Sequence, residues 1–437
     1  MKLLQTGSRI LASRVGQAIV IAVTGILVAR ALGPTGQGHL SLTLLVIMLS
    51  AAVLNGGMGL AAVPPLRRGE TTLARMLGAQ AVWIAGVAAV VLLFALLLPH
   101  TGLATLAHRH LGWTSLSPLL TGLAILALLG FEIFFYDLLA EGKVVTGPVI
   151  NLSRAFLHLG VVGLLILRGW LNLDGALAAY GLAQLYAVVM VGLLLRRWSL
   201  RMPKADPADQ APPLPQPLGK IVQRNLQRGW IGQVSAVASL LHLRLDQAIV
   251  SAFWGASVVG VYAVAVQAGE ILWLLAGALS PVLVYTSAEP EESAARDLLA
   301  ARAVRLSLVA TATVAVPLAL LAHPLITFFY GEAYAGSAAA LQALLPGIVA
   351  FAPAAVLAGD FIGRGRPVWN AQASALTVLV NVITGLLLIP RLGAVGAAWA
   401  STIAYVVGAG VMLGRFHRAS GLGWTEIFRL RRSDLRR

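Results

Sequence analysis

Three arginines, Arg14, Arg154 and Arg244, lie inside long and otherwise apolar segments of this sequence. A charged side chain is costly in hydrocarbon, so such residues usually face a cavity, pair with another group, or reach an interface. Arg154 lies near the middle of its segment, and we expect it to face a cavity. Arg14 lies near one end, where it could instead snorkel to lipid headgroups.

Three carboxylates, Glu132, Asp246 and Glu270, occupy the same kind of segment. Burial disfavours the charged form of a carboxyl group, so these residues could take up and release a proton. A fixed ion pair with an intramembrane arginine is the alternative. Asp246 and Arg244 point to roughly opposite sides of one helix, so we expect one to face a cavity and the other to reach the outer interface.

Polar residues follow helical spacing in two segments that lie 223 residues apart. Residues three and four apart share one face of a helix. The first stripe is Asn151, Arg154 and His158, and the second includes Ser374, Thr377 and Asn381 at the corresponding positions. Gln17 shares a face with Arg14, and Gln267 shares one with Glu270. The stripes predict a polar cavity, or else hydrogen bonds between helices.

A short motif, Asp-x-x-x-x-Gly-[Lys/Arg], also occurs twice at an offset of 223. Its key residues are Asp137 with Lys143 in the first copy and Asp360 with Arg366 in the second. At offset 222, "LGPTGQGHL" lies over "WGASVVGVY". The sequence therefore predicts a duplicated half. The motif residues are expected to close a turn through a local ion pair, and gating is the alternative role.

Composition places this chain in a membrane. It has 437 residues, of which 58% are hydrophobic and 11% charged, whereas a soluble domain averages about 25% charged residues. Cysteine is absent, which excludes disulfides, thiol catalysis and zinc–thiolate sites. The eight histidines show no metal-ligand spacing, so we expect no cofactor beyond a coupled H⁺ or Na⁺.

Twelve segments are long enough to cross a bilayer as helices, which takes about 20 residues. They predict an all-α polytopic protein with two six-helix bundles, 1–200 and 220–418, a Pro-rich linker at 201–219 and a basic tail at 419–437. Because each half has an even number of helices, both halves enter the membrane in the same orientation. Two such halves are related by an axis along the membrane normal. The predicted spans are 8–31, 39–62, 74–97, 115–137, 144–166, 174–195, 229–251, 257–284, 303–322, 338–360, 367–389 and 393–414.

The basic residues predict the orientation of these spans. With the N-terminus inside, the cytoplasmic segments hold 25 of the 32 Lys and Arg residues and the outer loops hold four. This asymmetry places both termini in the cytoplasm. It also explains the net charge of +15 without nucleic-acid binding, because basic loops meet anionic lipid at the inner face. The tail is expected to form a short amphipathic helix or to be disordered.

Several stretches resemble bacterial polysaccharide flippases of the Wzx type, within the multidrug/oligosaccharidyl-lipid/polysaccharide exporter superfamily. They include "ILVARALGPTGQGHLSL", "LNGGMGLAAVPPLRRGE", "LRLDQAIVSAFWGASVVGVYAVAVQAGEILWLLAGAL", "YGEAYAGSAAALQALLPG" and "GRGRPVWNAQASALTVLVNVITGLLLIPRLGAVGAAWAS". The resemblance implies two bundles around a central cavity and alternating access. Its implied cargo is undecaprenyl-diphosphate-linked oligosaccharide at the cell inner membrane, with a polysaccharide polymerase and chain-length machinery as potential partners.

On this resemblance we assign a hypothetical role to each polar residue. Arg14, Arg154 and Arg244 would bind the diphosphate as charge-assisted donors. Glu132, Asp246 and Glu270 would carry ion coupling. The sugar hydroxyls would bind Gln17, Asn151, His158, Gln267, Ser374, Thr377 and Asn381.

Three other functions stay open. A multidrug exporter of the same superfamily would favour a cavity rich in acids, whereas three arginines lie within the membrane here. A membrane-embedded polysaccharide polymerase or ligase would need a large outer loop, and the outer loops here reach only about 17 residues, so we expect no enzyme. A sugar facilitator would carry a charged motif after its second span that "PLRRGETTLARM" lacks.

Overall fold

The computed structural model describes residues 2–143, 145–201, 216–273, 280, 283, 287 and 293–430. Within these residues the chain is helical, with turns and no strand. Packing divides it into two compact units, unit 1 (residues 1–32 and 39–240) and unit 2 (residues 33–38 and 241–437). Most of the expected linker lies outside the described residues, and the division falls between residues 240 and 241, inside a helix.

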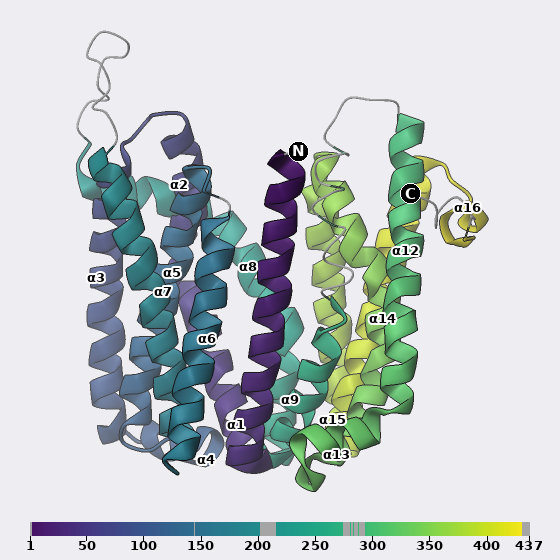
Figure 1. Ribbon diagram of the computed structural model, residues 1–437, viewed down its shortest axis with the longest axis horizontal. Coiled ribbons are helices and arrows are strands. Elements are labelled where there is room, and N and C mark those ends of the chain that lie inside the picture. Colours follow the sequence, from purple (N-terminus) through teal and green to yellow (C-terminus); the bar gives the residue numbers. More distant parts are fainter. Residues whose placement is uncertain are drawn as a thin grey trace. The chain divides into compact units, whose positions relative to one another are not determined.

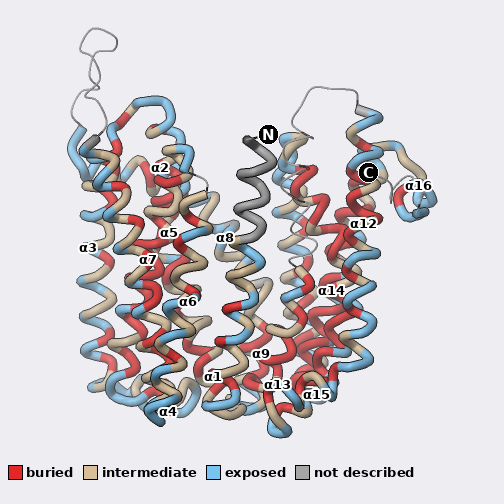
Figure 2. The backbone as a smooth tube through the Cα atoms, in the orientation of Figure 1, coloured by how far each residue is buried: buried red, intermediate tan, exposed pale blue. Residues whose placement is uncertain are grey.

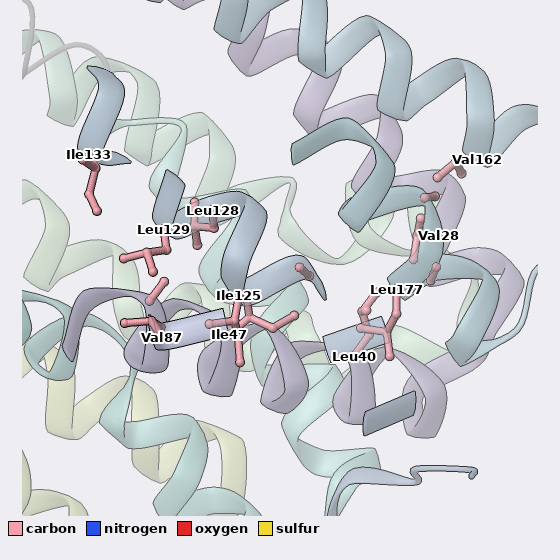
Figure 3. Packing of buried hydrophobic residues seen from close by; sticks show 14 of the residues in the cluster. Val28, Leu40, Ile47, Val87, Ile125, Leu128, Leu129, Ile133, Val162 and Leu177 are labelled. Atoms are coloured by element: carbon pink, nitrogen blue, oxygen red, sulfur yellow. The ribbon is translucent and has the colours of Figure 1, made fainter. Parts of the chain in front are cut away.

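Unit 1 is organised around α5, which packs against α2, α3, α6 and α7 (Figure 1). Aliphatic side chains such as Ile47, Leu129 and Leu177 fill its core (Figure 3). The elements are α1 (Lys2–Asn55), α2 (Met58–Arg67), α3 (Leu73–Leu97), η1 (Leu98–His100), α4 (Leu103–Leu111), α5 (Ser117–Ala140), α6 (Thr146–Leu167), α7 (Leu173–Arg201) and the first part of α8 (Leu218–Trp254).

Unit 2 is organised around α14, which packs against α9, α12, α13 and α15. Most of α14 is buried, while α12 exposes more of its surface (Figure 2). The elements are the last part of α8, α9 (Ala256–Glu270), α12 (Ser293–Leu320), α13 (Ala322–Tyr330), η2 (Glu332–Tyr334), α14 (Gly336–Gly363), α15 (Pro367–Ser420) and α16 (Trp424–Phe428).

The helices account for all twelve predicted spans, although most of the eighth span beyond Trp273 lies outside the described residues. Nine helical segments of the described chain are long and apolar enough to cross a membrane. Three of them, Ser13–Asn55, Leu243–Glu270 and Pro367–Ser420, each include parts of two predicted spans. The two parts meet at Gly33, Gly255 and Gly393, respectively. The chain is therefore an all-α, multi-pass membrane protein.

The backbone repeats the duplication that the sequence predicts. Gly33 (φ 66°, ψ 176°) and Gly255 (φ 77°, ψ −177°) lie 222 residues apart and have nearly the same conformation. Such positive φ values strain any residue with a Cβ, so both positions favour glycine. Gly38 and Gly260, five residues later in each copy, meet within unit 2. A Cβ on Gly38 would lie 1.8 Å from Ala256 O, so the two copies approach through their backbones.

The tail begins with the short helix α16, in which Ile427 is buried and packs in a core cluster with α12 residues. Arg305 of α12 donates a 2.5 Å hydrogen bond to Glu426 O. The start of the basic tail is thus a docked helix in unit 2, and residues 431–437 lie outside the described residues.

Candidate functional site

A polar pocket of about 350 Å³ lies inside unit 1, between α1, α5, α6 and α8. Its polar lining residues are Asn55, Glu132, Tyr136, Asn151 and Gln233. Asn55 Nδ2 donates to Glu132 Oε2 at 3.5 Å, and Gln233 Nε2 donates to Ala52 O at 2.5 Å. The Oδ1 atom of Asn151 is buried without a donor among the described residues. The pocket therefore offers both an acid and an unused acceptor to a ligand.

Arg154 lies one turn beyond Asn151 on α6 and is only partly exposed. Its Nη1 donates to Gln184 Oε1 of α7 at 2.5 Å, and its guanidinium lies 5.3 Å from the centre of the Phe131 ring. Within the described part of the chain, no carboxylate lies within ion-pair distance of Arg154. A neutral amide and an aromatic face position this cation without cancelling its charge.

The other predicted residues of unit 1 take different positions. His158 packs edge-on against Tyr180, with ring centroids 6.1 Å apart, so its ring fills space between α6 and α7. Arg14 is exposed on α1 and Gln17 is half-buried. Exposure of Arg14 agrees with both alternatives, snorkelling to lipid headgroups and facing a cavity. Its role toward a diphosphate and that of Gln17 toward a sugar stay predictions.

Unit 2 contains a hydrogen-bond network around the buried Asp246 of α8. Tyr262 of α9 and Ser401 of α15 both donate to Asp246 Oδ2, the latter at 3.2 Å. The backbone N–H of Gln247 donates to Oδ1 at 2.8 Å, and Asn381 Nδ2 donates to Ser401 Oγ at 3.1 Å. The fold thus brings Asp246 and Asn381 into one network, and donors surround the carboxylate.

Arg244, two residues before Asp246, forms an ion pair with Glu270 of α9 at 3.0 Å. Arg244 and Asp246 both find polar partners on neighbouring helices. The expectation that one of them faces a cavity and the other reaches the outer interface stays a prediction. The pairing also cancels the positive charge of Arg244 locally. Gln267, one turn before Glu270, has a buried Oε1 atom without a donor among the described residues.

The polar stripe near the start of α15 mostly serves packing within unit 2. Thr377 is buried, and its hydroxyl donates to Ala373 O at 2.8 Å on the same helix. A Cβ on Gly408 would lie 2.3 Å from Thr377 Oγ1, so two stretches of α15 touch there. Ser374 is half-buried. Thr377 and Asn381 thus follow the alternative of contacts between helices.

The repeated Asp-x-x-x-x-Gly-[Lys/Arg] motif closes two equivalent helix ends. Lys143 N donates to Leu138 O at 2.9 Å, and Arg366 N donates to Phe361 O at 2.8 Å. The glycines between them, Gly142 (φ 70°) and Gly365 (φ 71°), are both left-handed. This six-to-one bond with a left-handed glycine is the Schellman ending of a helix.

The expected ion pairs between the two ends of this motif are wrong. Asp137 is fully buried and accepts from Gln80 Nε2 at 3.1 Å, while Lys143 lies over the Trp198 ring. In the second copy Arg366 lies over the Trp369 ring. The reason is geometric, because the Schellman turn directs the basic side chain away from the preceding helix toward an aromatic ring.

Asp360 finds its cation within its own turn. Arg364 Nε lies 2.6 Å from Asp360 Oδ2, and Arg364 Nη2 lies 2.7 Å from Asp297 Oδ1. Ser287 Oγ donates to Asp360 Oδ1 at 2.6 Å. Burial disfavours the charged guanidinium, but the hydrogen bonds and charges of the two aspartates outweigh it and raise the pKa of Arg364. The matching position in the first copy is Glu141, so Asp137 has no such partner.

Several residues that complete these sites were absent from the predicted set. They are neutral side chains inside apolar spans, and intramembrane polarity alone would have marked them. Which of them pair with a charge depends on the rotation of neighbouring helices, which periodicity does not define. The residues are Asn55, Gln80, Gln184, Tyr262 and Ser401. No group of three or more His, Asp or Glu side chains able to hold a metal occurs in the described chain.

Comparisons with known proteins agree with a transporter fold. The model of the family described as lipid II flippase MurJ matches residues 161–432. A solved lipid II flippase MurJ in an inward closed conformation has a TM-score of 0.73 at 15% identity, covering 93% of this chain and 87% of that one. No curated protein sequence matches the chain.

Multidrug transporters of the same superfamily share the fold. An inward-facing MATE family transporter of the MOP superfamily has a TM-score of 0.67 at 15% identity, covering 93% of this chain and 94% of that one. The Vibrio cholerae MATE transporter VcmN has a TM-score of 0.58 at 13% identity, covering 97% of each chain. At these identities the likeness concerns the fold alone.

Proposed function

Because the chain belongs to the lipid II flippase MurJ family, whose model matches more than half of it, we propose that it translocates undecaprenyl-diphosphate-linked oligosaccharide across a membrane by alternating access. Family members are flippases, so the chain is a membrane transporter of lipid-linked cargo rather than an enzyme. The proposed cargo unit serves polysaccharide synthesis. A peptidoglycan precursor, the lipid II of the relatives' name, is the second cargo to test.

The neutral surroundings of Arg154 support an anionic cargo most directly. Its guanidinium is held by Gln184 and the Phe131 ring, and both partners are neutral. A diphosphate would gain charge-assisted hydrogen bonds from it in a low-dielectric site. Arg244 could take part only by exchanging Glu270 for phosphate, because it forms an ion pair in this structure. Among the three predicted arginines, Arg154 is thus our first candidate.

The neighbouring 350 Å³ pocket is our proposed site for sugar hydroxyls. Asn151 lies on the same helix as Arg154, three residues earlier, and lines the pocket together with Asn55 and Gln233. Amide side chains both donate and accept, as hydroxyl recognition requires. A saccharide next to the diphosphate would thus meet neutral polar groups in unit 1.

Glu132 is our first candidate for ion coupling by H⁺ or Na⁺. It lines the same pocket and has one long hydrogen bond, from Asn55 at 3.5 Å. Asp246 is already surrounded by donors, and Glu270 is paired with Arg244. A carboxylate that opens onto a pocket can exchange an ion with less rearrangement than one that is fully bonded.

The orientation of the basic residues supports a cell inner membrane location with both termini in the cytoplasm. In that orientation the cargo would move from the inner to the outer leaflet. A polysaccharide polymerase with its chain-length machinery would then receive the cargo, and these are the partners we propose.

Complementation tests the function and separates the two cargoes. The gene should restore surface polysaccharide in a strain that lacks its polysaccharide flippase, and the lipid-linked intermediate should stop accumulating. A strain depleted of its lipid II flippase forms the second arm. If the gene rescues only the second strain, the cargo is lipid II rather than the polysaccharide unit. If it rescues neither strain but lowers drug accumulation in the cell, the chain is a multidrug exporter.

A further inference from the structure

A second pocket of unit 1, of about 610 Å³, lies beside the ends of α2 and α5 and the start of α8. Leu60, Val63 and Leu139 contribute apolar walls, while Arg68 and Arg228 contribute charge. The pocket is therefore amphipathic, with aliphatic walls and a basic edge.

Backbone contact brings these segments together. A Cβ on Gly57 would lie 2.2 Å from Gly229 O, and a Cβ on Gly229 would lie 2.3 Å from Gly57 O. Only glycine allows this approach. Gly229 directly follows Arg228 and lines the pocket itself, so the crossing sets the position of the basic edge.

Arg68 and Arg228, which line the pocket, share one carboxylate with Arg224 of the same cluster. Glu70 lies 3.6 Å from Arg68, 3.9 Å from Arg224 and 4.0 Å from Arg228. These distances exceed those of close charge-assisted hydrogen bonds. Three guanidinium groups against one carboxylate leave two positive charges in excess. The cluster thus retains both charge and donors for a further anion.

Arg224 carries the most direct indication of a missing acceptor. Its side chain is 19% exposed, and its Nε and Nη2 atoms are buried without a hydrogen-bond acceptor among the described residues. Leaving a buried donor of a charged group unsatisfied costs free energy. A ligand with several anionic oxygens would satisfy both atoms.

We propose that Arg68, Arg224 and Arg228 bind the diphosphate headgroup of a polyprenyl lipid, with the first part of its chain in the adjoining apolar pocket. Two excess positive charges match a diphosphate better than the single charge of a phosphodiester. Guanidinium forks suit phosphate oxygens geometrically. The identity of the lipid rests on the proposed function, while the headgroup site rests on this cluster. The three arginines lie outside the membrane-spanning segments, whereas Leu139 of the apolar pocket belongs to the spanning helix α5. This pocket is separate from the one beside Arg154, although Tyr136 lines both.

Binding to the purified full-length protein tests this site without relying on transport. Farnesyl diphosphate serves as the probe in calorimetric titration in detergent, with inorganic pyrophosphate and phosphatidylglycerol as the comparison ligands. We expect Arg224→Gln and the exposed Arg68→Gln each to weaken farnesyl diphosphate binding by about tenfold or more, since each loses hydrogen bonds to a charged group. Glu70→Gln should strengthen binding, because it removes the competing carboxylate.

Arg197→Gln is the matched control, because Arg197 is an exposed arginine at the end of α7 outside the cluster. Equal binding by the control and the cluster variants would overturn the site and leave the arginines as topology determinants. Phosphatidylglycerol that binds as tightly as farnesyl diphosphate would assign the site to phospholipid and refute the cargo lipid. Pyrophosphate that binds as tightly would refute the role of the apolar pocket.

The transport and binding results separate the two proposals. Loss of binding in the cluster variants, in a protein that rescues neither flippase-deficient strain, would retain the headgroup site and reject the proposed function. If the protein rescues a flippase-deficient strain but its cluster variants bind the probe normally, the proposed function is retained and the headgroup site is rejected.

Discussion

Arg154 donates a 2.5 Å hydrogen bond to Gln184 Oε1, so a membrane-embedded cation is positioned by a neutral amide. Gln184 is buried and lies on α7, while Arg154 lies on α6. This relationship leaves the charge of Arg154 available, and it yields the first prediction.

Replacing Gln184 by Glu should impair transport while keeping the local shape. The new carboxylate would form an ion pair with Arg154 and compete with an anionic cargo. Arg154→Gln should have the same effect by removing the cation, with a loss of about tenfold or more. Flipping by purified protein in liposomes measures both variants. Arg168→Gln, at the end of α6, is the control, and a fully active Gln184→Glu variant would contradict the role of Arg154.

The Arg244–Glu270 pair should contribute to stability more than to cargo binding. Arg244→Gln would leave Glu270 without its cation, and we expect a loss of about 1–3 kcal/mol. The double variant Arg244→Gln, Glu270→Gln should recover part of this loss, because neither charge remains unpaired. Thermal unfolding in detergent measures both. A double variant that is stable but does not flip cargo would contradict this prediction, because it would show that Arg244 or Glu270 acts in transport.

The two copies of the helix-end motif should differ in their response to the same substitution. Asp360→Asn would remove the carboxylate that Arg364 contacts at 2.6 Å, and loss of one partner of a buried ion pair costs about 3 kcal/mol or more. Asp137→Asn should cost little, because the new amide oxygen can still accept from Gln80. Melting temperatures of the two variants test the difference, and equal losses would show that the carboxylates act alike.

The repeated kinks should require glycine for conformational reasons. Gly33→Ala and Gly255→Ala should each cost about 1–2 kcal/mol, since an L-residue is strained at positive φ. Gly86→Ala is a suitable control, because Gly86 lies in α3 and a Cβ there would meet no atom within 4 Å. Alanine favours helix by up to about 1 kcal/mol over glycine, so the control should gain stability. A kink variant as stable as the control would contradict the backbone argument.

The fold could be read from the sequence because it depends on local properties. Apolar runs of membrane length predicted the twelve spans, and an offset of 222 to 223 residues predicted the duplication. Gly33 and Gly255 show the same offset in their backbone angles. The functional site could be predicted less completely from the sequence. Periodicity placed Asn151 and Arg154 on one face of α6, but it could not identify Asn55 or Gln184 as their neighbours.

The sequence by itself determined that this chain is a helical membrane protein with two related halves, since hydrophobic length and chain spacing require no knowledge of partners. Only the tertiary structure decided which charges remain available. Arg154 meets a neutral amide, Arg244 meets Glu270, and Arg364 meets two aspartates. The physical reason is that the pairing of a side chain depends on the rotation and depth of the helix opposite. Many rotations suit the same apolar pattern, and packing selects one.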